Sequence, residues 1–179
     1  MPFNTNSTYG NVVYSSPTWE TKILANDGTT LSSATVATVS ELDIPIGKYE
    51  RIIGDLVMWY DTDGTNDLDM RIVNFDSAGS AVATTLRYAA QGVVAGDALS
   101  NDEATNAPSI SVASTTTGGT GDQIGFRAAV DEDAFLRVNF SALSTAATNG
   151  TLHFQFANST GSGAGTHLLA GSYITWKRF

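Results

Sequence analysis

Apolar and polar residues alternate with a period of two along much of the chain. The alternation is clearest in residues 68–72, 123–130, 136–140 and 152–156; in the last of these, Leu152, Phe154 and Phe156 alternate with His153 and Gln155. Successive side chains of a β-strand point to opposite faces, so this pattern is typical of strands with one face in a core and the other in water. Each of these segments is therefore predicted to be a strand.

Residues 52–60 differ because they are apolar almost without interruption. A continuous apolar run predicts a central strand that is covered on both sides, which would place Trp59 in the core. Weaker strand patterns are found near residues 18–25, 34–44, 81–90, 109–113 and 168–178.

Turn-forming residues separate these segments at short intervals. They include Asn26-Asp27-Gly28 and the segments 61–64, 76–79, 131–133 and 149–150. Roughly ten strands with such frequent turns predict an all-β, antiparallel sandwich or barrel. A short helical turn is expected around residues 97–105, and three longer loops, 92–108, 114–121 and 158–166, are expected to be mobile or used for contact.

The length of 179 residues is enough for one hydrophobic core without disulfides or a metal. We expect a flexible N-terminal arm at residues 1–16 and a single β-sandwich domain at 17–179. Hydrophobic residues make up 42% of the chain and charged residues only 15%, which argues against disorder and against a coiled coil.

The net charge of −9 disfavours contact with a nucleic acid or an anionic membrane, because both are polyanionic surfaces. The absence of cysteine excludes thiol catalysis, iron-sulfur clusters and cysteine zinc sites. Residues 1–10 contain no basic segment followed by an apolar one, so we expect synthesis in a host cytoplasm without a signal peptide.

The densest group of oxygen ligands lies between residues 61 and 69. It contains the weak calcium candidates Asp61, Asp63, Asp67 and Asp69. Calcium prefers six to eight hard oxygens, but here the glycine falls too early for an EF-hand loop and no glutamate closes the ring. A solvated hairpin turn between strands that end at Tyr60 and begin at Leu68 is the favoured interpretation.

Catalytic arrangements are hard to place in this sequence. The two histidines, His153 and His167, are interpreted as surface residues, and no Gly-x-Ser-x-Gly motif presents a nucleophile. A glycosidase would need two carboxylates facing each other across a cleft, and the five glutamates offer no such pair. We therefore expect no enzymatic activity, no catalytic residue, no metal and no cofactor.

Aromatic residues offer a different kind of site, because flat sugar faces stack on exposed rings. The candidates are Trp19, Trp59, Tyr60, Tyr88, Tyr173 and Trp176. Most aromatic residues of a two-layer sandwich belong to its core. Trp19 and Trp176 lie near the two ends of the chain, where they would pack against each other or against a neighbouring subunit, so a core or interface role is favoured over a sugar platform.

Taken together, the sequence resembles small structural proteins of tailed bacteriophage particles. The resemblance rests on low charge, abundant Thr, Ser, Ala and Gly, the absence of cysteine, a polar N-terminal segment and a C-terminal strand that ends in Ser172-Tyr173-Ile174-Thr175-Trp176-Lys177-Arg178-Phe179. It is similar in style to capsid decoration or cement proteins and to head-fibre proteins, and no residue signature can be carried over.

The resemblance implies a jelly-roll-like sandwich that forms a homotrimer, binds the major capsid protein and stabilises the virion surface. Avidity would provide the binding strength. Under this hypothesis the arm and the terminal strands supply the interface candidates Phe3, Tyr9, Tyr14, Trp19, Tyr173, Trp176 and Phe179. The alternative is a trimeric head similar to the tumour-necrosis-factor and C1q sandwiches, in which the long loops bind a receptor or a glycan at the tip of a phage tail or fibre.

Overall fold

The structure is a computed structural model that describes residues 7–9, 12–14, 18–28, 30–32, 35–62, 67–94, 112–115, 124–127, 133–158 and 165–179. These residues form fourteen strands, several of them only two to four residues long, and one 3-10 turn. Roughly ten strands were expected, and the additional strands are short segments of two or three residues. The prediction of an all-β fold is confirmed.

The larger sheet contains seven strands, and all of its pairs are antiparallel. Its order is β3 (Glu20–Ile23), β14 (Tyr173–Arg178), β6 (Arg51–Thr62), β11 (Asp133–Ser144), β8 (Thr84–Val94) and β9 (Val112–Thr115), and β13 (Thr166–Leu168) also pairs with β6.

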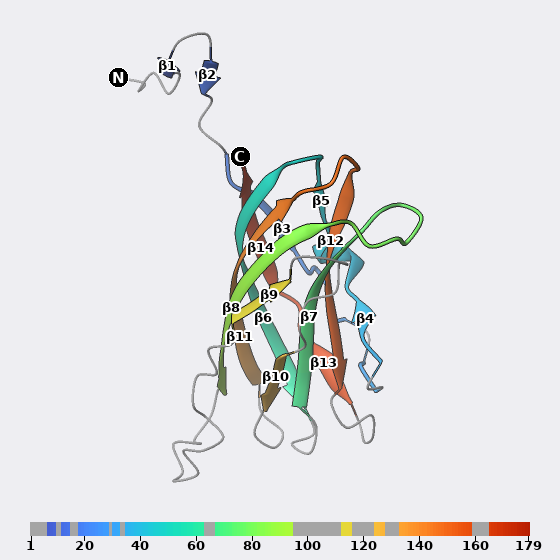
Figure 1. Ribbon diagram of the computed structural model, residues 1–179. Coiled ribbons are helices and arrows are strands. Elements are labelled where there is room, and N and C mark those ends of the chain that lie inside the picture. Colours follow the sequence, from blue (N-terminus) through green and yellow to red (C-terminus); the bar gives the residue numbers. More distant parts are fainter. Residues whose placement is uncertain are drawn as a thin grey trace, which may run out of the picture.

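The smaller sheet contains five strands, again antiparallel. Its order is β10 (Ile124–Arg127), β7 (Asp67–Phe75), β12 (Gly150–Asn158) and β4 (Ala37–Thr38), and β5 (Ile44–Ile46) also pairs with β12. The two sheets lie face to face (Figure 1). The short strands β1 (Ser7–Tyr9) and β2 (Val12–Tyr14) pair with each other and with no other described strand.

The strand order is that of a jelly roll. If β4 and β5 together count as the second of eight principal strands, the larger sheet contains the first, eighth, third and sixth strands, and the smaller one contains the second, seventh, fourth and fifth. This arrangement brings strands that are distant in sequence together, as two Greek keys do. Strands β8 and β9 extend the larger sheet beyond β11.

The core lies between the two sheets, where the inward positions of the strands meet. The ring centroids of Phe140 in β11 and Phe154 in β12 are 5.3 Å apart, so one edge-to-face pair joins the two layers. Gly54 in β6 makes room for this pair, because a Cβ atom at that position would lie 2.5 Å from Phe140 Cζ. The other large, fully buried side chains include Leu56, Met58, Tyr60, Leu68, Met70, Ile72 and Phe156.

Two connections differ from the sequence-based expectation. The segment between Tyr60 and Leu68 was predicted to be a hairpin turn, but β6 belongs to the larger sheet and β7 to the smaller one, so the chain crosses between layers there. Residues 34–44 were expected to form one strand. They contain β4 and a 3-10 turn, Ser40–Leu42, before β5 begins, and both short strands pair with β12, so the turn interrupts one edge of the smaller sheet.

Of the other expectations, one turn is confirmed, and the rest concern segments that lie mostly outside the described residues. The turn at 76–79 is confirmed: Asp76 Oδ1 accepts hydrogen bonds from the backbone N–H groups of Ala78 and Ser80 at 2.9 and 2.8 Å, and Gly79 adopts a φ of 78°. The helical turn around 97–105 lies outside the described residues, as do most of the loops 92–108, 114–121 and 158–166.

Candidate interaction surface

The outward side of the larger sheet carries an unusual amount of exposed apolar surface. In β6 the residues Ile52, Leu56, Met58 and Tyr60 point into the core, so the alternate positions, which include Trp59, point outward. The expectation that Trp59 is buried is therefore wrong, since 38% of its surface is exposed. The apolar residues of β6 continue on the outward side, where no other described strand forms a second layer over them.

Six of the seven large apolar side chains that are exposed among the described residues lie on this same side. They are Trp19, Ile23, Trp59, Leu143, Tyr173 and Phe179, and the seventh, Tyr49, lies in the turn between β5 and β6. We call the outward side of β3, β14, β6 and β11 that these six residues mark the apolar face. The pairing registers place them in two groups: Tyr173 lies opposite both Ile23 and Val57, near Trp59, whereas Leu143 lies opposite Arg51 at the other end of β6. A polar row that contains Thr175 and Asp55 lies between the two groups.

Side-chain contacts order parts of the apolar face. The ammonium group of Lys177 lies 5.2 Å from the ring centroid of Trp19 and 5.0 Å from that of Phe179, which is a cation-π geometry on both sides. Phe179 is fixed beside the start of β6, because its backbone N–H and C=O both hydrogen-bond to the backbone of Arg51. On the neighbouring strands Trp59 packs against Phe135 with ring centroids 5.0 Å apart.

A polar group lies at the centre of the apolar face. Arg137 Nε donates to both carboxylate oxygens of Asp55, at 3.1 and 3.0 Å, and its Nη2 also bonds to the same carboxylate. Asn139 Nδ2 donates to Asp55 Oδ1 at 2.6 Å. The hydrogen bond to Asp55 raises the pKa of Arg137, which stays charged. Asp55 is thus neutralised within the face.

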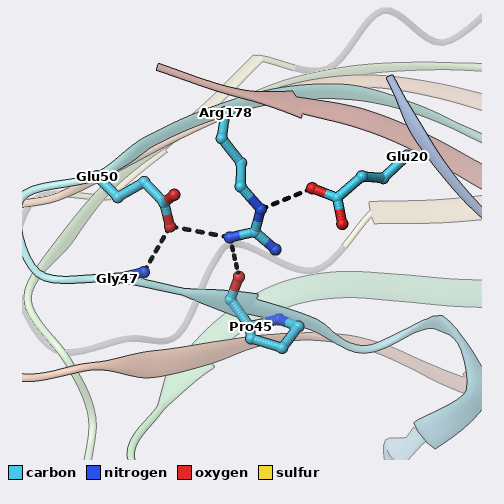
Figure 2. Close-up of polar contacts among 5 residues, drawn as sticks. All are labelled: Glu20, Pro45, Gly47, Glu50 and Arg178. Carbon is cyan, nitrogen blue, oxygen red and sulfur yellow. Dashed lines mark hydrogen bonds and ion pairs between the residues drawn. The ribbon is translucent and has the colours of Figure 1, made fainter. Parts of the chain in front are cut away.

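One end of the apolar face is fixed by a second polar cluster around Arg178, drawn in Figure 2. Arg178 Nε donates to Glu20 Oε1 at 2.8 Å, and its Nη1 donates to Glu50 Oε2 at 3.0 Å and to the carbonyl of Pro45 at 2.7 Å. The backbone N–H of Gly47 donates to the same Glu50 oxygen at 2.6 Å. Because Pro45 belongs to the smaller sheet, this cluster connects β14 and β3 to the opposite layer.

The outward side of the smaller sheet is different in character. Arg71 Nε donates to Gln155 Oε1 at 2.8 Å, and Gln155 Nε2 donates to Thr38 Oγ1 at 3.0 Å, so a ladder of polar side chains crosses β7, β12 and β4. We call this side the polar face. Its side chains satisfy one another across the strands, as expected for a sheet surface in contact with water.

Next to this ladder, His153 and Asp43 form an ion pair with Nδ1 and Oδ1 2.9 Å apart. His153 was interpreted as a surface residue, but only 22% of its side chain is exposed, and its ring lies 6.0 Å from that of Phe75. Burial raises the pKa of Asp43, an effect opposed by the hydrogen bond and charge of His153 and by the charge of Lys22.

The structure does not bring the described calcium candidates together. Asp61 lies on the outward side of the larger sheet, and Asp69 alternates with the buried Leu68 and Met70, which places it on the outward side of the smaller one. Asp63 lies outside the described residues, and the side chain of Asp67 is not described. Across the described ranges no three His, Asp or Glu residues are grouped so that they could hold a metal ion.

The interface candidates divide into three groups. Trp19, Tyr173 and Phe179 lie on the apolar face, whereas Trp176 is only 3% exposed and belongs to the core, because it shares the inward side of β14 with Ile174. Phe3 falls outside the described residues, and the side chains of Tyr9 and Tyr14 are not described. Sequence reasoning missed Ile23 and Leu143. The alternation Trp19, Thr21, Ile23 offered a signal for the first, whereas nothing in the sequence separated Leu143 from a core residue.

A small pocket borders the apolar face. Its volume is about 210 Å³, and it lies between the end of β3 and β4, with Leu24, Leu31, Val39 and Leu168 at its base. Asp27 and Glu41 line its polar side, and Asp27 is engaged with the backbone N–H of Ala170. No helix within the described part of the chain is long and apolar enough to cross a membrane.

Comparison with known proteins gives no close relative. No family model matches the chain, and no curated protein matches it. Among solved structures, the VP2 subviral particle of infectious bursal disease virus matches with 12% identity and a TM-score of 0.28, covering 93% of this chain and 42% of that one. A viral particle of the same virus matches with 11% identity and a TM-score of 0.28, covering 96% and 41%.

The chain therefore spans less than half the length of these viral proteins. A TM-score below 0.5 does not establish a shared fold, so these two structures say nothing about the function of this chain.

Proposed function

We propose that this chain is a non-enzymatic structural protein of a virus particle that decorates and stabilises the capsid surface as an oligomer. The oligomer is expected to be a trimer, and the partner on the shell is expected to be the major capsid protein. The composition and the style of the sequence, which resemble phage decoration and head-fibre proteins, give the proposal its direction.

One observation carries the proposal more than any other: the exposed large apolar side chains are gathered on one sheet face. Exposed apolar surface that is concentrated on one face marks a site of protein association. An enzyme of this fold would instead be expected to gather titratable groups in a cleft. The polar clusters around Asp55 and Arg178 are ion-paired and internally satisfied, which supports a structural role for them.

The fold also suits repeated attachment to a shell. A jelly roll is a rigid scaffold, so a contact surface on its sheet needs little ordering when it binds. Many copies, each joined to its neighbours and to the shell, would hold by avidity even if every single contact were weak.

The test is to ask whether the protein is part of the particle and whether it rebinds. Virus particles made from the genome that encodes this chain are purified, stripped of loosely held proteins, mixed with the purified protein and pelleted. We expect the protein to pellet with the particles and to saturate at a fixed number of copies per capsid. Immunogold labelling of intact particles is expected to place it on the shell.

Two results would contradict the proposal. Protein that stays in the supernatant at every concentration would exclude decoration of the shell. Labelling confined to tail tips, together with saturable binding to a host glycan, would favour the receptor-binding alternative. Serum albumin of matched concentration serves as the control for trapping in the pellet.

A further inference from the structure

We infer that the apolar face is covered by the apolar face of a second copy of this chain. The inference rests on the proposed self-association and names the surface through which it forms. Because both copies use the same face, the contact is isologous and closes with two copies, so it predicts a dimer and not the trimer that the resemblance implies. Three independent features of the described residues lead to a second copy as the occupant.

The first feature is the pattern of β6. From Ile52 to Tyr60 it is apolar apart from Gly54 and Asp55, which is typical of a strand covered on both sides. The smaller sheet covers the inward side, where Leu56 and Met58 are fully buried. On the outward side Val57 is 7% exposed and Trp59 is 38% exposed. The sequence is therefore that of a central layer, and the described residues provide only one of the two layers that such a strand requires.

The second feature is the size of the surface. From Arg51 to Trp59 a strand rises about 27 Å, and four strands cover about 19 Å of width including side chains, so the flat area is on the order of 500 Å². Side-chain relief increases the accessible area further. Stable interfaces bury about 800 Å² on each partner. Two such faces together would bury on the order of 1,000 Å², which is the lower limit for a specific interface.

The third feature is the match in chemistry. Apolar surface is buried best against apolar surface, and outside the apolar face Tyr49 is the sole large exposed apolar residue of the described chain. Among the described residues, the same face of another copy is therefore the one surface of this chain that offers a matching apolar area.

The test uses the full chain and a pair of matched variants. Ile23→Lys combined with Tyr173→Lys places two ammonium groups on the apolar face at residues that are 62% and 37% exposed, so the monomer loses little packing. Tyr49→Lys is the control, because it replaces a 66% exposed aromatic residue that lies off the face. Mass is measured by light scattering over a dilution series, and circular dichroism verifies that each variant is folded.

The wild type and Tyr49→Lys are expected to have a mass that is a multiple of 18.8 kDa, whereas the double variant is expected to be an 18.8 kDa monomer, with self-association at least about 100-fold weaker because two buried charges would lack partners. A wild-type monomer at every concentration would overturn the inference. So would a folded double variant that keeps the wild-type mass.

Tryptophan emission provides a second readout. Two of the three tryptophans, Trp19 and Trp59, lie on the apolar face, and the third, Trp176, is in the core. The emission of the wild type is expected to shift to shorter wavelength as concentration rises, and that of the double variant is expected not to shift. A wild-type spectrum that does not depend on concentration while the mass increases would show that the copies meet through another surface.

The outcomes of this test are separable from those of the particle-binding test. A monomer that still saturates the shell would refute the inference and leave the proposed decoration intact. An oligomer that forms through the apolar face but does not bind particles would support the inference and refute the decoration.

Discussion

The two outward faces of this sandwich are built on similar strands, yet they present opposite surfaces. On the polar face Arg71, Gln155 and Thr38 hydrogen-bond in a row across three strands, which leaves little reason for a partner to cover them. On the apolar face six large side chains lie exposed around one neutralised ion pair. The comparison teaches that alternation alone does not define the solvent side of a strand, because an outward position that stays apolar indicates a further layer.

The largest loss of stability is expected from a substitution in the core beneath the apolar face. Gly54→Ala would place a Cβ atom 2.5 Å from both Phe140 Cζ and the carbonyl of Thr175, so the strand must shift or the aromatic pair must separate. We expect a loss of about 2–4 kcal/mol in the free energy of unfolding, measured by chemical denaturation.

Gly47→Ala is the matched control, since the nearest atom to its added Cβ would be the side-chain oxygen Oε2 of Glu50 at 3.3 Å, which is not a buried aromatic ring or a strand carbonyl. It is expected to cost less than about 1 kcal/mol. Equal losses in the two variants would contradict the packing that we assign to Gly54.

A smaller loss of stability is expected when the contacts of Arg178 that join the two sheets at one end are removed. Arg178→Gln removes the ion pairs to Glu20 and Glu50 and the hydrogen bond to Pro45. The side chain is 31% exposed, so the expected loss is about 1–2 kcal/mol rather than the cost of a buried pair. Thermal denaturation measures it, and Lys48→Gln at the exposed turn nearby is the control. A variant as stable as the control would show that the cluster contributes nothing.

A third prediction concerns the polar face, which two substitutions would make apolar. Arg71→Leu together with Gln155→Leu would replace the hydrogen-bonded ladder with exposed leucines. We expect a change of less than about 1 kcal/mol in stability, because both side chains lie on the outward side, and a new concentration-dependent association. Light scattering measures the association. An unchanged mass at high concentration would mean that exposed apolar surface on a sheet is not sufficient for contact in this protein.

The smallest expected effect is a dependence of the free energy of unfolding on pH. It arises from Asp43, which lies next to the polar face. Burial raises the pKa of Asp43 above its ordinary value of 3.8, so the folded state keeps this proton to a higher pH than the unfolded chain does. The free energy of unfolding therefore falls as the pH rises through this window, because the folded state binds more protons there. Asp43→Asn is expected to remove this component.

The measurement is chemical denaturation of the wild type and of Asp43→Asn at a series of pH values from 3.8 upward. The stability of the wild type relative to the variant is expected to decrease as the pH rises. A difference that is constant, or that increases with pH, would show that the ion pair with His153 outweighs burial.

Much of the fold could be predicted from the sequence, since the alternation at residues 68–72, 136–140 and 152–156 sets the inward side of β7, β11 and β12. The Asp76 turn was predictable for the same local reason: its carboxylate accepts the backbone N–H groups of the turn. The strand order could not be predicted. Strands β6 and β7 are neighbours in sequence but belong to different sheets, and only contacts across the whole chain decide which sheet a strand joins.

The surface was predictable in part. Trp19, Tyr173 and Phe179 were selected as interface candidates, and they lie on the apolar face. Trp176 and Trp59 were assigned the wrong way round, because a one-residue difference in register exchanges core and surface in a strand. The clusters around Asp55 and Arg178 join residues more than 80 positions apart, so no local pattern could indicate them.

The central claim is that the apolar face is buried by another copy of the chain. The most direct test is the mass of the wild-type protein by light scattering, measured over a dilution series and followed by tryptophan emission on the same samples. The account predicts a mass that is a multiple of 18.8 kDa and that falls toward 18.8 kDa on dilution, with emission moving to longer wavelength as Trp19 and Trp59 become exposed. A mass of 18.8 kDa at every concentration, with constant emission, would contradict it.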